Sequence, residues 1–151
     1  MNPWDQLQFL IGSWSSPLSG EPGEGVKGAS TFSYQLDQKI VVRNSRAEFA
    51  PAPGEKEGLV HEDLLIIFQQ PGESGMRAIY FDNEGHIIQY KLSFPTGLAA
   101  VMFDSEATAT SPRARLVYEA APDGMLRTEF LVAVPGGELI SHVKGMLERA
   151  V

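Results

Sequence analysis

The 151-residue sequence contains no cysteine, so disulfides, thiolate catalysis and cysteine-ligated metal sites are excluded. It has no apolar run long enough to cross a membrane as a helix, and its first residues lack the basic start and apolar stretch of a signal peptide. Positive charge is scarce, because 12 Lys and Arg stand against 19 Asp and Glu, for a formal net charge of -7. This balance repels nucleic-acid backbones and anionic lipid. We therefore expect a cytoplasmic protein with no nucleic-acid or membrane partner.

Hydrophobic residues make up 43% of the chain and charged residues 21%, which is typical of globular proteins and excludes wholesale disorder. A chain of this length forms one domain, and no internal repeat divides it. We expect a single domain over residues 1–151. The sequence leaves open whether it forms a homodimer.

Only the first segment has a helical pattern. Asn2 is a favourable N-cap residue, and Pro3 suits the first helical position. Trp4, Leu7 and Ile11 fall on one side of the segment, and a glycine follows them. The pattern predicts a short N-terminal helix with an apolar stripe.

From Gly12 onward, apolar and polar residues alternate in short runs separated by turn residues. The runs predict strands at Ser13–Leu18, Val26–Leu36, Lys39–Phe49, His61–Gln70, Met76–Asp82, His86–Phe94, Ala99–Ser105, Ala114–Ala121, Met125–Val134 and Leu139–Glu148. Strands in sequence order with short connections are typical of an up-and-down barrel, which removes both sheet edges. We therefore expect an all-β, ten-stranded antiparallel β-barrel with a short N-terminal helix.

One turn predicts which residues of the later strands face inward, because residues paired across a hairpin share a face. In residues 121–125 (Ala-Pro-Asp-Gly-Met), a type I turn followed by a left-handed glycine pairs the two ends. Glu119 then lies opposite Arg127 on the solvent side. The same register places on the inner face Leu116, Tyr118 and Phe130.

A second turn makes the same kind of prediction for two earlier strands. Asp82 pairs with His86 across the turn Asp-Asn-Glu-Gly-His, and Tyr80 then pairs with Ile88. Tyr90 shares the face of Ile88. The register predicts that Tyr80, Ile88 and Tyr90 face the interior, with the Asp82–His86 pair near the rim.

The histidines are the candidate acid–base groups. His61 and Asp63 share one face of their strand and Glu62 lies on the other, but both faces continue with apolar residues, so the inward face stays open. His61 is therefore either a rim residue in a hydrogen-bond network or an acid–base group. His86 and Asp82 resemble a base with its orienting carboxylate, although no motif places a nucleophile beside them. The three histidines lie on different strands and have no zinc spacing.

Gly12-Ser13-Trp14, after the short helix, resembles the Gly-x-Trp signature of the calycins, which include lipocalins and fatty-acid-binding proteins. Arg149, near the chain end, strengthens the resemblance, because calycin barrels place a late Arg over that Trp at the closed end. Cation–π stacking gives a physical reason for the pair. The resemblance implies that Trp14 plugs the barrel floor and that Arg149 covers it.

Within the calycins, the chain resembles nitrobindin-like haem-binding barrels and uncharacterised bacterial calycin-like domains. The similar stretches are Leu10–Trp14, His61–Asp63 and His142–Arg149. In the nitrobindin-like group a histidine on the last strand ligates haem iron, and His142 is the matching position. The glycine- and tyrosine-rich stretch that follows the tryptophan in that group is replaced here by residues 15–20 (SSPLSG). The resemblance implies haem as an alternative cofactor, held by His142.

The last hairpin decides whether His142 faces the interior. With a two-residue turn at residues 136–137, Val143 faces inward and His142 faces solvent. With a three-residue loop at residues 135–137, His142 faces inward. A bulge at Gly145 would also change the inward face partway along the strand. The sequence leaves these alternatives open.

Arg43 and Arg46 are separated by an odd number of positions, so only one of them faces the interior of a regular strand. An interior Arg with Tyr80 or Tyr90 would receive a ligand carboxylate, by analogy with fatty-acid-binding barrels. The alternative is a solvated Arg paired with Glu48 or another surface acid.

We expect a binding protein that holds a small, mostly apolar molecule inside the barrel, with Tyr, His or Arg groups orienting the polar end of that molecule. The alternatives are a haem protein, an acid–base enzyme that uses the cavity, and an interaction module whose barrel is filled with side chains. The candidate ligand-binding residues are Tyr80, Tyr90, Ile88, Tyr118, Phe130, Leu116, Arg46, Arg43, His61 and His86.

Overall fold

The computed structural model describes residues 2–16, 25–106, 108 and 112–150. These residues form a 3₁₀ helix, η1 (Pro3–Leu10), ten strands and a short 3₁₀ turn, η2 (Pro122–Gly124). The strands are β1 (Gly12–Ser16), β2 (Gly25–Gln35), β3 (Ile40–Phe49), β4 (Leu59–Gln69), β5 (Met76–Asp82), β6 (Ile87–Ser93), β7 (Ala100–Ser105), β8 (Arg113–Ala120), β9 (Leu126–Ala133) and β10 (Ile140–Arg149). Residues 17 and 18, which the sequence places in the first strand, lie outside the described residues.

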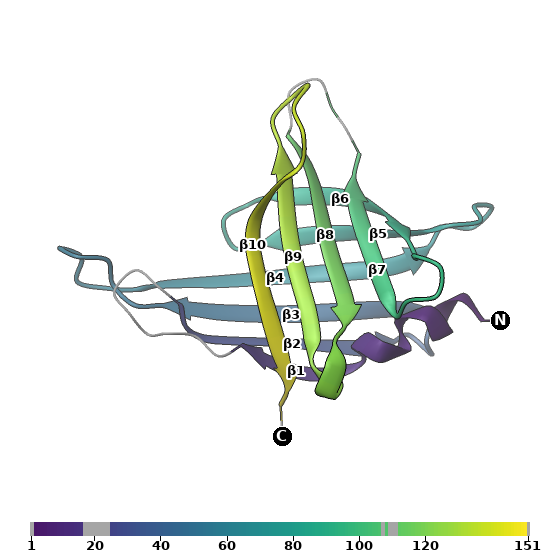
Figure 1. Ribbon diagram of the computed structural model, residues 1–151, viewed down its shortest axis with the longest axis horizontal. Helices are drawn as coiled ribbons and strands as arrows, with labels where there is room; N and C mark the ends of the chain where they lie inside the picture. The colour runs from purple at the N-terminus through teal and green to yellow at the C-terminus, as the bar shows by residue number, and fades with distance from the viewer. Residues whose placement is uncertain (1, 17–24, 107, 109–111, 151) are drawn as a thin grey trace.

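The strands form a closed antiparallel barrel. Each strand pairs with its neighbour in sequence, and β1 pairs with β10 to close the sheet. Figure 1 shows β8, β9 and β10 crossing in front of the long strands β2, β3 and β4. The predicted ten-stranded up-and-down barrel is therefore confirmed.

The N-terminal helix forms where the sequence predicts one, but as a 3₁₀ helix. The Asn2 side chain caps it by accepting a hydrogen bond from the Trp4 N–H at 3.0 Å. Leu7 and Leu10 are its buried residues, whereas Ile11 is only partly buried. A 3₁₀ helix has about three residues per turn, so the apolar stripe runs through Trp4, Leu7 and Leu10 rather than ending at Ile11.

The inner face of β2–β6 is defined by cross-strand pairing. An inward row of paired neighbours runs through Phe32, Arg43, Leu65, Tyr80 and Ile88. Phe32 and Leu65 are buried, and so is Arg43, at 5% exposure. Arg43 is therefore the arginine of β3 that faces the interior.

Both predicted turns have the expected register. Glu119 pairs with Arg127 on β8 and β9, and Tyr80 pairs with Ile88 on β5 and β6. The turn at residues 122–124 differs from the prediction in one detail. Asp123, with a φ of 66°, adopts the left-handed conformation as well as Gly124, for which alone it was predicted. Asp tolerates this region better than most residues, which allows the turn to close.

The β9–β10 hairpin combines the two registers that the sequence left open. Ile140 has the pairing expected from a three-residue loop, whereas Val143 has the pairing expected from a two-residue turn. The register shifts between them, so His142 is the extra residue of a β-bulge. The bulge lies at His142 and not at Gly145, where the sequence suggested it.

The first and last strands meet at Trp14. This residue is 2% exposed, and its indole N–H donates to the Leu10 carbonyl at 2.8 Å. The Arg149 guanidinium lies 4.1 Å from the centre of the Trp14 ring and donates to the Ile11 carbonyl at 2.6 Å. Gly12 has a φ of +130°, and a Cβ there would collide with Arg149. Arg149 therefore packs over Trp14 where η1, β1 and β10 come together.

Replacing Arg149 by Ala should lower the free energy of unfolding by about 2 kcal/mol, because it removes the cation–π contact and hydrogen bonds to backbone carbonyls. Urea denaturation followed by circular dichroism would measure the loss. Arg127→Ala is a matched control that removes only an exposed ion pair with Glu119, and it should cost less than about 1 kcal/mol. Equal losses in both variants would contradict a special role of Arg149.

Candidate functional site

The barrel contains a partly open cavity of about 520 Å³. Its wall combines apolar side chains from β6, β8, β9 and β10 with polar side chains from β3, β4, β5 and the β5–β6 turn. The lining residues are Arg43, His61, Asp63, Tyr80, Asp82, His86, Ile88, Tyr90, Leu116, Phe130 and Val143. A concave, mostly apolar space of this size with a few polar groups is typical of small-molecule sites.

A second hollow of about 570 Å³ lies on the outer face of β2–β5. It is more open to solvent than the inner cavity, and Arg46 is part of its wall. The Arg46 guanidinium pairs there with Glu62, and with Glu48 at 3.3 Å. Arg46 therefore takes the solvated position that the sequence allowed for one of the two arginines, and it does not contribute to the inner cavity.

Most of the predicted ligand-binding residues line the inner cavity. They are Arg43, His61, Tyr80, His86, Ile88, Tyr90, Leu116 and Phe130. Tyr118 is 4% exposed and is not part of the lining, but its hydroxyl supports Arg43.

His142 lies at the bulge of β10, is exposed, and is not part of the cavity lining. Its ring packs edge-on against Phe130, with the ring centres 6.3 Å apart. The neighbouring Val143 lines the cavity in its place. The bulge therefore separates His142 from the polar groups of the cavity wall.

A buried ion pair forms one end of the polar wall. The Arg43 Nη2 donates to Asp63 Oδ1 at 2.5 Å, and the Arg43 Nη1 donates to the Tyr118 hydroxyl at 2.8 Å. The two charged side chains are only 6% and 10% exposed. Burial opposes the positive charge, but Tyr118 and Asp63 outweigh it and raise the pKa of Arg43. The pair is therefore a fixed, internally neutralised part of the wall.

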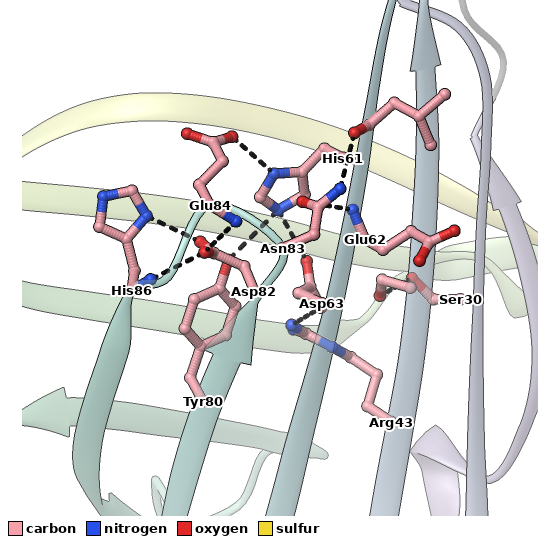
Figure 2. A network of polar contacts seen from close by, with 12 residues as sticks. Ser30, Arg43, His61, Glu62, Asp63, Tyr80, Asp82, Asn83, Glu84 and His86 are labelled. Atoms are coloured by element: carbon pink, nitrogen blue, oxygen red, sulfur yellow. Dashed lines mark hydrogen bonds and ion pairs between the residues drawn. The ribbon is translucent and has the colours of Figure 1, made fainter.

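His61 connects this ion pair to the rim. Its Nε2 lies 3.1 Å from Asp63 Oδ2 and 3.2 Å from the Tyr80 hydroxyl, and its Nδ1 lies 3.1 Å from Glu84 Oε1. Figure 2 shows the His61 ring between Glu84 on one side and Asp63 and Tyr80 on the other. Asp63 and Glu84 are carboxylates, which only accept hydrogen bonds. The His61 ring can therefore bond to Asp63 and Glu84 at the same time only when each of its two nitrogens carries a proton.

Asp82 is the other fixed anion of the wall. Its side chain is 3% exposed and accepts hydrogen bonds from the Tyr80 hydroxyl, the backbone N–H groups of Glu84 and His86, and the His86 Nδ1, all within 3.0 Å. Burial would raise the pKa of Asp82, but these donors outweigh burial and lower it to about 2. Burial and the nearby Asp63 raise the pKa of Tyr80, so its hydroxyl stays a neutral donor.

The β5–β6 turn is held against β4 by Asn83. Its Oδ1 accepts from the Glu62 N–H at 3.1 Å, and its Nδ2 donates to the Val60 carbonyl at 2.9 Å. Gly85, with a φ of +91°, allows the chain to reverse before His86. These contacts keep Asp82 and His86 beside the polar residues of β4, as Figure 2 shows.

Because the Asp82 carboxylate only accepts hydrogen bonds, its contact with the His86 Nδ1 favours the tautomer in which Nδ1 carries the proton. In this tautomer the His86 Nε2 is an acceptor without a partner in the part of the cavity wall that the structure describes. Among the described residues, none that lines the cavity is a Ser, Thr, Cys or Lys. Over residues 2–16, 25–106, 108 and 112–150, no group of three or more His, Asp or Glu side chains is placed to hold a metal ion.

A scan against protein-family models found no match, and a search of the curated proteins found no similar sequence. Within the part of the chain that the structure describes, no helix is long and apolar enough to cross a membrane.

Sequence reasoning did not include Asp63, Asp82 and Val143 among the candidate ligand-binding residues, although all three line the cavity. For Asp82 a signal was available, because the turn register placed it beside His86 at the rim. For Asp63 the signal was its position two residues from His61, which was ambiguous while the inward face of β4 was open.

Replacing Asp63 by Ala should lower the free energy of unfolding by about 3–5 kcal/mol, because it leaves the buried Arg43 charge without a partner. The double variant Arg43→Met/Asp63→Leu removes both charges and should recover most of this loss. Urea denaturation of both variants and the wild type would measure the two effects. If the Asp63→Ala variant is as stable as the wild type, the pair does not form.

The lowered pKa of Asp82 makes stability depend on pH. A carboxyl with a depressed pKa stabilises the folded state fully above about pH 4, the value of an unfolded Asp, and this contribution disappears as the pH falls to 2. The stability difference between wild type and Asp82→Asn should therefore be on the order of 1–2 kcal/mol at pH 6 and shrink towards pH 2.5. Urea titrations at several pH values would measure it. A constant difference would contradict a buried, ionised Asp82.

Proposed function

We propose that the protein binds a small, mostly apolar molecule inside the barrel. The observation that supports this proposal is the cavity of about 520 Å³, in which one part of the wall is apolar and the other part is polar. Ile88, Leu116 and Phe130 provide apolar surface for the body of the ligand, and the cluster around Arg43, His61 and Tyr80 provides hydrogen-bonding groups for its polar end.

We further propose that the chain is a calycin-like barrel. The closed antiparallel topology, the N-terminal helix and the stacking of Arg149 on Trp14 next to Gly12 support this assignment. Calycins hold their ligands inside such barrels, which agrees with a ligand in the cavity described above.

Haem with His142 as axial ligand is the alternative that the resemblance implied, and the residues do not fit it. An axial ligand must project an imidazole nitrogen into the cavity. His142 is exposed at the bulge, its ring contacts Phe130, and Val143 takes its place in the cavity wall. We therefore favour an organic ligand without iron coordination by His142.

Native mass spectrometry of the protein as expressed, together with thermal shifts across a panel of lipids and metabolites, tests the proposal. A copurifying small molecule or a specific thermal shift supports it. Absence of both would favour a barrel that acts through its outer surface.

Ile88→Trp should reduce the affinity for a copurified or panel ligand at least about tenfold, because the larger side chain fills part of the cavity. Isothermal titration calorimetry would measure the affinity. Ile140→Trp is the matched control, since Ile140 is 71% exposed on β10 and does not line the cavity, and its affinity should stay unchanged. Equal affinities of Ile88→Trp and wild type would place the ligand elsewhere.

A further inference from the structure

Each charged group of the cavity wall already has partners within the protein: Arg43 and Asp63 pair with one another, and Asp82 accepts four hydrogen bonds. Arg43 is bound by Asp63 at 2.5 Å, and both side chains are nearly buried. Nη2 of Arg43 is held by Asp63, Nη1 is held by the Tyr118 hydroxyl, and the unpartnered Nε is buried. A ligand carboxylate would have to displace one of these two partners, and displacing Asp63 would leave a buried carboxylate without its partner. An anionic ligand therefore gains little from the one buried arginine.

A cationic ligand would also find no unpartnered carboxylate among the described residues of the cavity wall. Asp82 accepts four hydrogen bonds from Tyr80, Glu84 and His86, and Asp63 holds Arg43 and His61. Asp82 therefore uses its full capacity of about four hydrogen bonds, and each oxygen of Asp63 already accepts one, from Arg43 or from His61. Desolvation of a ligand ammonium group would not be offset by a new ion pair.

Two neutral polar atoms of the lining remain free among the described residues. The Tyr90 hydroxyl has no hydrogen-bond partner there, although the residue is 2% exposed. Burial raises the pKa of Tyr90 to about 12, so the hydroxyl stays protonated and available as a donor. The second atom is the His86 Nε2, which accepts when Nδ1 donates to Asp82.

From this pairing we propose that the cavity selects an uncharged apolar molecule whose polar group is a hydroxyl. A hydroxyl both donates and accepts, so it can meet either the Tyr90 hydroxyl or the His86 Nε2, whereas a carboxylate only accepts and an ammonium only donates. The proposal rests on the proposed function of the cavity, because it assigns the chemical class of the molecule bound there.

The test compares three probes of equal chain length at pH 7.5: decan-1-ol, decanoate and decylammonium. Titration calorimetry of the full chain should show that decan-1-ol binds at least about tenfold more tightly than either charged probe. Decanoate or decylammonium binding as tightly as decan-1-ol would overturn the ligand class and leave the proposed function standing. Binding of none of the three by the folded protein would overturn the ligand class and also count against the proposed function.

Two variants sharpen the test. Tyr90→Phe should weaken decan-1-ol binding about three- to tenfold, because it removes one free hydroxyl from the wall. Tyr34→Phe is the matched control, since the Tyr34 hydroxyl contacts η1 outside the cavity, and it should bind decan-1-ol like the wild type. Equal losses in the two variants would overturn the role of Tyr90.

Asp63→Asn tests the pairing directly. This change keeps the shape of the side chain and removes the charge that neutralises Arg43. Decanoate should then bind at least about tenfold more tightly than it binds the wild type. Unchanged weak binding of decanoate by the folded variant would overturn the explanation that Asp63 excludes anions.

Discussion

The pairing of β1 with β10 is the contact on which the rest of the barrel depends. β1 is short and meets β10 at Trp14 and Ser15, which lie opposite Arg149 and Glu148. Because few backbone hydrogen bonds fit into so short a contact, side chains must add to it, and Arg149 does so through Trp14 and the Ile11 carbonyl. Only when this seam is closed do β8–β10 face β3–β6 across a common interior. The cavity is thus a consequence of closure as much as of the residues that line it.

Within this interior, the polar cluster around Arg43 and Asp63 contributes little net stability for the number of buried polar groups that it contains. Well-packed apolar residues in place of a buried ion pair are often at least as stabilising. Here Arg43 instead contacts Asp63 and Tyr118, lies 6.0 Å from the centre of the Tyr80 ring, and leaves its Nε without a partner. A network that stabilises the fold so little is more typical of a binding site than of a structural core. Its position in the wall of the cavity agrees with this interpretation.

Much of the fold could be predicted, because the turn residues and the alternation of apolar and polar residues determine how neighbouring strands pair. The β8–β9 and β5–β6 hairpins illustrate this, since a few turn residues determined every pair along each hairpin. β4 could not be oriented in the same way, because Leu64 and Ile66 on its outer face are partly buried and Ile66 pairs with Val42, which is 5% exposed. When both faces of a strand are apolar, alternation loses its information. The bulge at His142 was not predicted, because Pro135 favoured one register of that hairpin and the apolar pattern favoured the other, and the strand adopts each register on one side of the bulge.

The sequence predicted many of the residues that line the cavity, but it did not predict how the charged ones pair. The sequence predicted that Tyr80 and Tyr90 face inward and allowed one inward arginine beside them, and in isolation these residues suggest a carboxylate receptor. What alternation cannot show is which side chain on the next strand lies against the arginine. Asp63 follows that arginine by 20 positions, and the β3–β4 and β4–β5 registers bring it between Arg43 and Asp82. A buried charge attracts a ligand only to the extent that its neighbours leave it unpaired. In the proposed site, the partner that the adjacent strand supplies, rather than the arginine itself, would therefore determine which ligand charge is favoured.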